Sequence, residues 1–419
     1  MSRKNSHWFW IPSLYIAAEI PAAMVTYVAL LMFIQFGAGV GLSSVLSGLL
    51  FLPRILKSYF RSKVRNQGNF KRYLHVVQTL MFCAIMGCAI YMTYCVVNVW
   101  VLFAFLLVVS CLCAWHELLD TMYYNRMLYP REQKLLNNSK MLVVQVTVVV
   151  TYGLLIIIAG SLQVFFRNYQ KAWAMDCSVL AGVMLLMLCV NALVLKNPKV
   201  HNPYRYQSLL SAFQNEVRII DRIKHKPNVA GVLTCLFFLL LPQALMFNSR
   251  VFFLLAPVAE GGLECSLQEV GFAQGTIGVI AFSVGISLGR YVLYTKRQES
   301  MFYPMAVMLT LSPVVYLVMA LMPEYFDLPM LSVMTMIAQF LFGFGLNVCM
   351  VFVRFISEQR YRNTFNYLYI PLVALMMLVP VLVSGWLIEE VGYVVFFIIN
   401  CSCIPLAWIA LGMKRIPNS

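Results

Sequence analysis

Charged residues are scarce in this sequence. Asp, Glu, Lys and Arg make up 11% of its 419 residues, whereas hydrophobic residues make up 61%. A soluble domain carries about a quarter charged residues, so this composition excludes a soluble globular fold. It predicts instead a protein that spans a membrane several times.

Acidic residues are fewer than basic ones. The sequence has 16 Asp and Glu residues and 31 Lys and Arg residues, which gives a net charge of +15. Such an excess is found in nucleic-acid-binding proteins, but also in membrane proteins, whose cytoplasmic loops collect Lys and Arg. Here the basic residues are clustered between apolar segments. We therefore attribute them to membrane topology and expect no nucleic-acid partner.

The sequence also lacks the motifs of several enzyme classes. A P-loop, a Gly-rich dinucleotide turn and a nucleophile elbow are absent, so an ATP-driven pump or a membrane hydrolase is not expected. The pairs Cys111/Cys113 and Cys401/Cys403 lack the further ligands of a zinc site. We expect no enzyme activity, no metal and no cofactor.

Long apolar segments are abundant. A helix needs about 20 apolar residues to cross the hydrocarbon core of a bilayer. Twelve segments meet this length: 8–36, 40–60, 73–97, 99–123, 141–166, 175–195, 229–257, 267–294, 301–322, 328–356, 367–387 and 391–413. The sequence therefore predicts an all-α polytopic membrane protein with twelve transmembrane helices.

One polar stretch, residues 196–228, separates the first six segments from the last six. This layout predicts an N-terminal six-helix bundle at 1–195 and a C-terminal six-helix bundle at 229–419, the organisation of the major facilitator superfamily. Apolar residues recur at helical spacing from Tyr206 to Ile223, which predicts an amphipathic helix in the linker. That helix is either a latch between the bundles or a plain connector.

The basic residues also predict the orientation of the chain. With the N-terminus inside, only Arg167, Lys171 and Arg250 of the 31 Lys and Arg residues belong to outward connections. Because Lys and Arg collect on the cytoplasmic side, both termini are expected to be cytoplasmic.

Glu19 is a candidate for proton coupling. It lies about 16 Å along the first helix at 1.5 Å per residue, and a charge at the centre of a span costs about 2.5–3.5 kcal/mol, which makes it a functional candidate. Pro21 beside it predicts a kink. The alternative for Glu19 is a structural hydrogen bond to a neighbouring span.

The fourth segment carries His116, Glu117 and Asp120. Their spacing places either His116 and Asp120 or Glu117 and Asp120 on one helical face. They either line the inner mouth of a cavity or form an ion-pair network with basic residues, namely Arg54, Lys57 or Arg126.

Four amide side chains in the predicted spans of the second half are further candidates. Uncharged amides hydrogen-bond a polar solute, but they also join helices within a membrane. They are Gln243, Gln274, Gln339 and Asn347.

Several stretches, in order, resemble the AmpG-like muropeptide permease branch of the major facilitator superfamily, especially versions from Bacteroidetes-type bacteria. They are WIPSLYIAAEIP from Trp10, FLPRILK from Phe51, EVG from Glu269 with GTIGVIA from Gly275, FGFG from Phe342 and SGWL from Ser384.

The resemblance implies proton-coupled import of anhydro-muropeptides across the bacterial inner membrane. Glu19 would be the acidic residue of the first span, and His116, Glu117 and Asp120 would match the acidic motif of the fourth. The chain departs from the family pattern after the second span, in the seventh span and before the glycines of the tenth, where charged or acidic residues are missing. These departures motivate an alternative, a non-transporting subunit that holds an envelope complex together.

Overall fold

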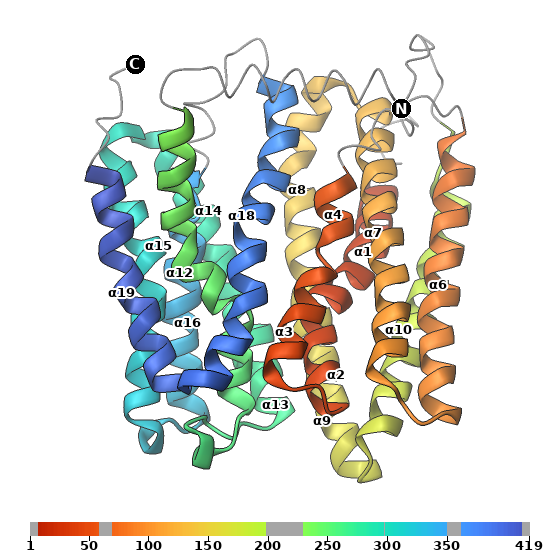
Figure 1. The fold of residues 1–419 in the computed structure, drawn as a ribbon. Coiled ribbons are helices and arrows are strands. Elements are labelled where there is room, and N and C mark those ends of the chain that lie inside the picture. Colours follow the sequence, from red (N-terminus) through yellow and green to blue (C-terminus); the bar gives the residue numbers. More distant parts are fainter. Residues whose placement is uncertain (1–6, 58–68, 198–228, 297, 350–361, 413–419) are drawn as a thin grey trace. The chain divides into compact units, whose positions relative to one another are not determined.

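The computed structural model describes residues 7–57, 69–197, 229–296, 298–349 and 362–412 (Figure 1). The chain divides into two compact units, the first formed by Met1–Ala38 and Leu50–Glu216 and the second by Gly39–Leu49 and Val217–Ser419. The predicted amphipathic helix of the linker lies outside the described residues. The predicted bundle boundaries stay a prediction.

The first unit consists, in its described part, of helices. They are α1 (His7–Ala23), η1 (Met24–Val28), α2 (Ala29–Gln35), α4 (Leu52–Leu56), α6 (Phe70–Tyr94), α7 (Val99–Met127), α8 (Pro130–Val148), η3 (Val149–Leu154), α9 (Leu155–Phe166) and α10 (Tyr169–Val194). α6 packs against α7 and α10, and α1 packs against α7, α8 and α10. Trp10, Tyr123 and Trp173 are among the largest side chains buried between them.

The second unit is likewise helical where it is described. Its elements are α3 (Val40–Leu49), α12 (Val229–Leu255), η4 (Val258–Glu260), α13 (Leu267–Val270), η5 (Gly271–Gly278), α14 (Val279–Thr295), α15 (Gln298–Leu321), η6 (Pro323–Tyr325), α16 (Leu328–Gly345), α18 (Arg362–Val391) and α19 (Tyr393–Gly412). α16 packs against α14 and α15, while α12 packs against α18 and α19. α3 packs against α18 and so belongs to this unit.

Glycines allow the closest helix contacts in the second unit. A Cβ atom at Gly285 would lie 2.5 Å from the Phe340 carbonyl oxygen, and one at Gly343 would lie 2.3 Å from that of Phe282. α14 and α16 therefore approach each other through their backbones, which small residues at a helix contact allow.

The predicted spans match the observed helices. In the described chain, ten helices are long and apolar enough to cross a membrane, and two shorter apolar helices, Val40–Leu56 and Tyr393–Ile409, stand at the second and twelfth predicted segments. The prediction of an all-α polytopic membrane protein is confirmed.

Two helices differ in detail from the predicted segments. The helix of the fifth span extends back to Pro130, ahead of the apolar span Ser139–Phe166, because proline suits the first helical turn and the Glu132 carboxylate accepts a hydrogen bond from the Tyr129 N–H at 2.9 Å. The second span is interrupted between α3 and α4, just before Pro53, which cannot donate a helical hydrogen bond.

The first span changes its helical winding beyond Pro21. α1 ends at Ala23, and the π-helical turn η1 follows. Within η1 the Thr26 hydroxyl donates to the Ala22 carbonyl at 2.7 Å. Turns of this kind are frequent at functional sites.

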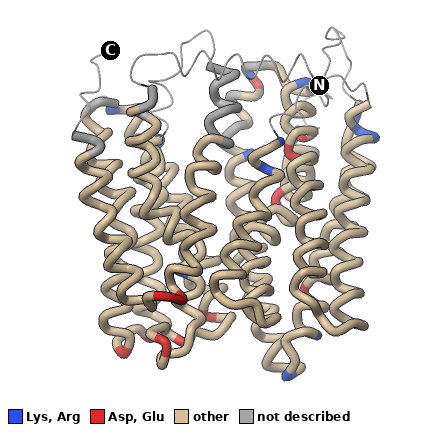
Figure 2. The backbone as a smooth tube through the Cα atoms, viewed as in Figure 1, with Lys and Arg blue, Asp and Glu red and all other residues tan. Residues whose placement is uncertain are grey.

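The two units hold their acidic residues differently (Figure 2). In the second unit, seven of its ten acidic residues gather at one end, where α12, α15 and α18 end and α13 and α16 begin: Glu260, Glu264, Glu269, Glu324, Asp327, Glu389 and Glu390. In the first unit, Glu19, Glu117, Asp120 and Asp176 lie inside helices of the bundle. The interior of the first unit is therefore the place to look for ionisable chemistry.

Candidate functional site

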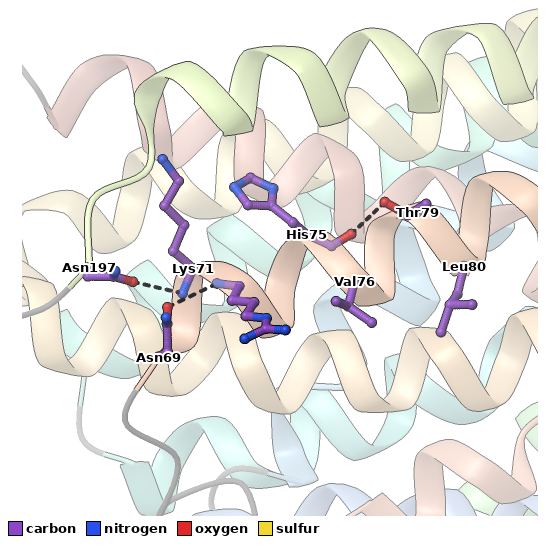
Figure 3. Close-up of a pocket in the computed structure, with 8 residues that line it drawn as sticks. Asn69, Lys71, His75, Val76, Thr79, Leu80 and Asn197 are labelled. Carbon is purple, nitrogen blue, oxygen red and sulfur yellow. Dashed lines mark hydrogen bonds between the residues drawn. The ribbon is translucent and has the colours of Figure 1, made fainter.

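A groove of about 510 Å³ opens beside the first turns of α6 (Figure 3). Its lining combines basic, amide and apolar side chains: Asn69, Lys71, Arg72, His75, Val76, Thr79, Leu80 and Asn197. Lys71 donates from Nζ to the Ala192 carbonyl at 2.8 Å, which ties this helix end to α10. None of the eight predicted site residues lines this groove, so the candidate site must be sought elsewhere.

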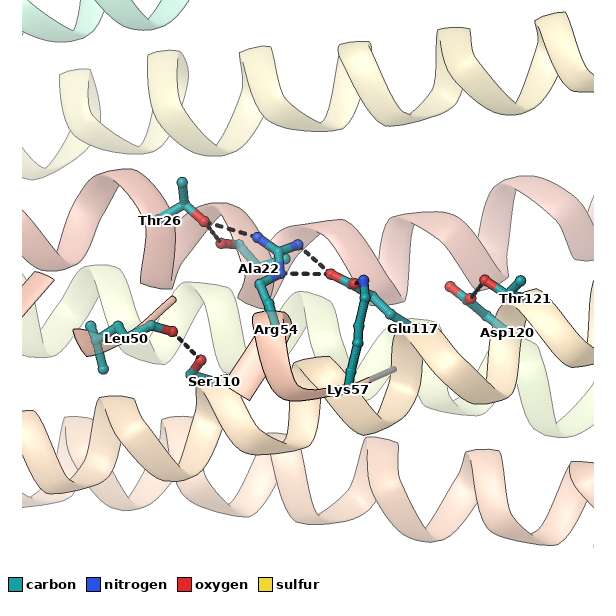
Figure 4. A network of polar contacts seen from close by, with 9 residues as sticks. All are labelled: Ala22, Thr26, Leu50, Arg54, Lys57, Ser110, Glu117, Asp120 and Thr121. Carbon is teal, nitrogen blue, oxygen red and sulfur yellow. Dashed lines mark hydrogen bonds and ion pairs between the residues drawn. The ribbon is translucent and has the colours of Figure 1, made fainter. Parts of the chain in front are cut away.

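The candidate site is a group of six ionisable side chains in the first unit, which we call the charged cluster: Glu19, Arg54, Lys57, Glu117, Asp120 and Lys140. Glu117 of α7 is its most fully paired member (Figure 4). One of its oxygens accepts from Arg54 Nε at 2.7 Å and also from Nη2, and the other accepts from Lys57 Nζ. The ion-pair network that the sequence offered as an alternative therefore exists for Glu117, with Arg54 and Lys57.

Local structure fixes this contact. Ser110 of α7 donates to the Leu50 carbonyl at 2.5 Å. This hydrogen bond fixes the segment between the end of α3 and the start of α4 to α7. Glu117 lies seven residues further, two turns along the same face of α7, where it meets the side chains of α4. Arg54 also donates from Nη1 to Thr26 at 3.2 Å, which connects α4 to the π-helical turn of the first span.

Glu19 lies half-buried on α1. It interacts electrostatically with Arg54, Glu117, Lys140 and Lys57. Among the described residues no group donates a hydrogen bond to its carboxylate, so the alternative of a structural hydrogen bond finds no partner there. Its carboxylate is available to a proton or a solute.

Asp120 is almost fully buried, with 3% of its surface exposed. The Thr121 hydroxyl donates to it at 3.1 Å, and Lys140 is the basic group with which it interacts electrostatically. The Lys140 ammonium lies over the ring of Tyr15 at 4.3 Å and over that of Tyr124 at 5.2 Å. In the described part of the chain it forms no ion pair with a carboxylate, but it interacts electrostatically with both Glu19 and Asp120.

The charged cluster is electrically balanced when every member is ionised. Three carboxylates face three cations, so the cluster can be buried without a net charge. One added proton leaves it with an excess positive charge. Its protonation state is therefore coupled to any other charge that enters the unit.

His116 belongs to a different network. Its Nε2 lies 2.9 Å from Gln78 Nε2 of α6, and Asn191 of α10 donates to Gln78 at 3.3 Å and to the Ser13 carbonyl of α1 at 3.5 Å. This chain of hydrogen bonds joins four helices. His116 and Asp120 share a face by spacing, but the structure gives them separate partners.

The four predicted amides all make hydrogen bonds inside the second unit. Gln243 donates to the Leu309 carbonyl at 2.5 Å and so joins α12 to α15. Gln339 donates to Gln274 at 3.2 Å, and Gln274 donates to Tyr316 at 2.6 Å. Asn347 donates to the Ile286 and Phe344 carbonyls at 3.3 and 3.1 Å. Only Gln274 and Gln339 come together as side chains.

Sequence reasoning missed three ionisable residues that lie within helices of the bundles. Lys140 was left one residue outside the predicted fifth span. Asp176, 4% exposed in α10, has an Oδ1 without a hydrogen-bond partner in the described structure. Arg250, assigned to an outward connection, lies within α12 and is 8% exposed. The criterion that singled out Glu19, a charge inside a span, could have found Asp176 and Arg250.

No protein-family model and no curated protein matches the sequence. Solved structures do: a bacterial homologue of the human lysosomal transporter Spinster, inward-facing and unoccupied, matches with a TM-score of 0.72 and 15% identity over 100% of both chains. The nucleoside transporter NupG matches with 0.71 and 12% identity over 98% of this chain and 99% of that one. A D-xylose–proton symporter matches with 0.62 and 12% identity over 98% and 97%. Likeness at such identity concerns the fold, and the predicted major facilitator fold is confirmed.

Proposed function

We propose that this chain is a secondary active transporter of the bacterial cytoplasmic membrane that imports a small polar solute together with protons by alternating access. The solute class we propose is the peptidoglycan fragments, anhydro-muropeptides, that the AmpG-like sequence stretches imply. The fold shared with solved solute transporters supports transport. The observation that supports proton coupling is that Lys140, held over the rings of Tyr15 and Tyr124, interacts electrostatically with both Glu19 and Asp120 and forms no ion pair with either.

Lys140 makes the cluster sensitive to a proton. With Glu19 and Asp120 both ionised, each carboxylate attracts its ammonium. A proton on Glu19 removes one of these attractions, so Lys140 is drawn to Asp120. Because α1, α7 and α8 carry the three groups, protonation changes how these helices hold one another, which is the coupling that a symporter requires.

The paired members of the cluster serve a different role. Arg54, Lys57 and Glu117 satisfy one another and hold α4 against α7. Because two cations share one carboxylate, the paired members together carry an excess positive charge, and each of them interacts electrostatically with Glu19.

The test is uptake of a labelled anhydro-muropeptide into proteoliposomes, with and without an inward proton gradient. We expect the gradient to accelerate uptake by wild type at least tenfold. Glu19→Gln and Asp120→Asn should lose this acceleration, because an amide cannot exchange a proton. The matched control is Glu324→Gln, which removes an exposed carboxylate at the end of α15 and should behave as wild type.

Two results would count against the proposal. Equal gradient dependence of wild type and both variants would remove the cluster from coupling. Absence of uptake of any muropeptide, together with a stoichiometric protein partner retained through gentle purification, would favour the non-transporting subunit of an envelope complex.

A further inference from the structure

Arg250 is a buried cation with no anionic partner in the described part of the chain. It lies in α12, five residues before the helix ends at Leu255, and only 8% of its surface is exposed. Among the described residues its Nε has no hydrogen-bond partner and no carboxylate forms an ion pair with it. The guanidinium carbon lies 5.5 Å from the ring centroid of Phe247. Burying a charge without a counter-charge is strongly unfavourable, so this position calls for an anion.

The packing of α12 and α15 shows what Arg250 faces. These helices are two spans apart in the chain and run in the same direction, and Gln243 of α12 donates to the Leu309 carbonyl of α15 at 2.5 Å. Seven residues further, two turns along each helix, stand Arg250 and Tyr316. The two side chains interact electrostatically, in agreement with this register. Arg250 and Tyr316 therefore stand at the same level of the two packed helices.

Tyr316 belongs to a buried polar group drawn from three elements. Gln274 of η5 donates to its hydroxyl, and Gln339 of α16 donates to Gln274. Thr335 lies one turn before Gln339 on α16, and its buried hydroxyl has no hydrogen-bond partner among the described residues. Both face Gly278 of η5, where an added Cβ would lie 3.2 Å from Gln339 Cγ and 3.3 Å from Thr335 Cγ2. Polar side chains thus surround Tyr316, with which Arg250 interacts, whereas no carboxylate of the described residues pairs with Arg250.

We propose that Arg250 binds an anionic oxygen group of the solute, a carboxylate or a phosphate, with Tyr316 and the Gln274–Gln339 pair orienting it. This inference rests on the proposed transport function and deepens it by naming the charge of the solute. A planar guanidinium offers paired N–H donors that match both kinds of oxyanion. The proposed anion neutralises the buried charge of Arg250, for which the described residues of this unit provide no ion-pair partner.

Binding to the purified full-length protein in detergent tests the site without requiring transport. The probes are anhydro-N-acetylmuramic acid, its uncharged carboxamide and an N-acetylglucosamine phosphate, each titrated by calorimetry. Wild type should bind at least one charged probe at least tenfold more tightly than the carboxamide, and the carboxylate and phosphate arms identify which oxyanion is preferred. Arg250→Gln should abolish the preference, and Arg250→Lys should keep part of it.

Lys296→Gln is the matched control, because it removes one exposed positive charge from the end of α14 in the same unit. It should bind like wild type. Should Arg250→Gln fail to fold, the partial preference of Arg250→Lys, measured on a monodisperse preparation, still decides the question. Equal binding of charged and uncharged probes, an unchanged preference in the Arg250 variants, or no binding of either charged probe would each overturn the proposal.

The experiments distinguish failure of the anion site from failure of the transport function. An anion preference that depends on Arg250, without uptake in proteoliposomes, would contradict the transport function and leave the site in place. Proton-driven uptake that Arg250→Gln leaves unchanged would contradict the site and leave the transport function in place.

Discussion

At the residue scale, Glu117 carries the strongest electrostatic contacts in the described chain. Its carboxylate is 15% exposed, whereas the side chains of Arg54 and Lys57 are 26% and 24% exposed. Glu117→Gln would remove the carboxylate with which both cations form ion pairs. Removing one partner of a buried pair costs about 3–5 kcal/mol, and partial exposure of the two cations places the expected loss near the lower end.

The measurement for Glu117→Gln is the thermal unfolding midpoint in detergent, with Glu324→Gln as the exposed control. We expect a clear decrease for Glu117→Gln and none for the control. Equal midpoints would mean that the ion pairs do not hold α4 against α7.

His116 provides the second prediction at this scale. His116→Leu would leave the buried Gln78 amide without its partner, at a cost of about 1–3 kcal/mol. Because His116 is not bonded to the charged cluster, the response of uptake to a pH gradient should match that of wild type, in contrast to Asp120→Asn. Loss of that response in a stable His116→Leu protein would show that His116 takes part in coupling.

The sequence identified part of the charged cluster and not the rest. Glu19, Glu117 and Asp120 could be predicted because an acidic residue inside an apolar segment is conspicuous. Lys140 could not, because its inclusion depends on where α8 begins, and a proline and a capping carboxylate set that start 11 residues before the apolar segment. Which partner each carboxylate takes depends on tertiary packing, which spacing along one helix does not specify.

At the element scale, α3 and α18 make a contact that depends on glycine. A Cβ at Gly385 of α18 would lie 2.5 Å from the Val40 carbonyl oxygen and 3.0 Å from the Gly41 Cα atom. Around it Ser44 of α3 donates to the Val381 carbonyl at 2.6 Å, and the Gly41 N–H donates to Glu389 at 2.8 Å. The two helices cannot separate slightly at Gly385 without weakening these hydrogen bonds.

Gly385→Ala should therefore destabilise the protein by about 1–3 kcal/mol through overpacking. Gly182→Ala in α10 is the matched control, because an added Cβ there meets nothing within 4 Å. The control should be neutral or slightly stabilising, since alanine favours the helix. The same midpoint for both variants would contradict the close packing of α3 on α18.

The apolar segments predicted which stretches form spans, because burial in lipid selects for length and hydrophobicity. They did not predict the π-helical turns η1, η3 and η5, nor the interruption between α3 and α4. These features depend on local hydrogen bonds, such as Ser110 to Leu50, that a hydropathy pattern does not contain.

At the scale of the whole molecule, the distribution of basic residues predicts that both termini face the cytoplasm. Cys95, exposed just beyond the end of α6, should then face outward. In a variant in which Cys95 is the one cysteine kept of the 12, an impermeant maleimide should label Cys95 in intact cells. Lys71→Cys in a cysteine-free background, at the opposite end of α6, should be labelled only after permeabilisation. The reverse labelling pattern would show that the topology is inverted.

The central claim is that the charged cluster couples a solute to protons. Proteoliposomes that contain a pH-sensitive dye and receive an inward gradient of anhydro-muropeptide, without an imposed pH gradient, test it most directly. The account predicts that solute entry acidifies the interior through wild type and that Glu19→Gln abolishes this acidification. Solute entry through wild type without acidification, or equal acidification through Glu19→Gln, would contradict it.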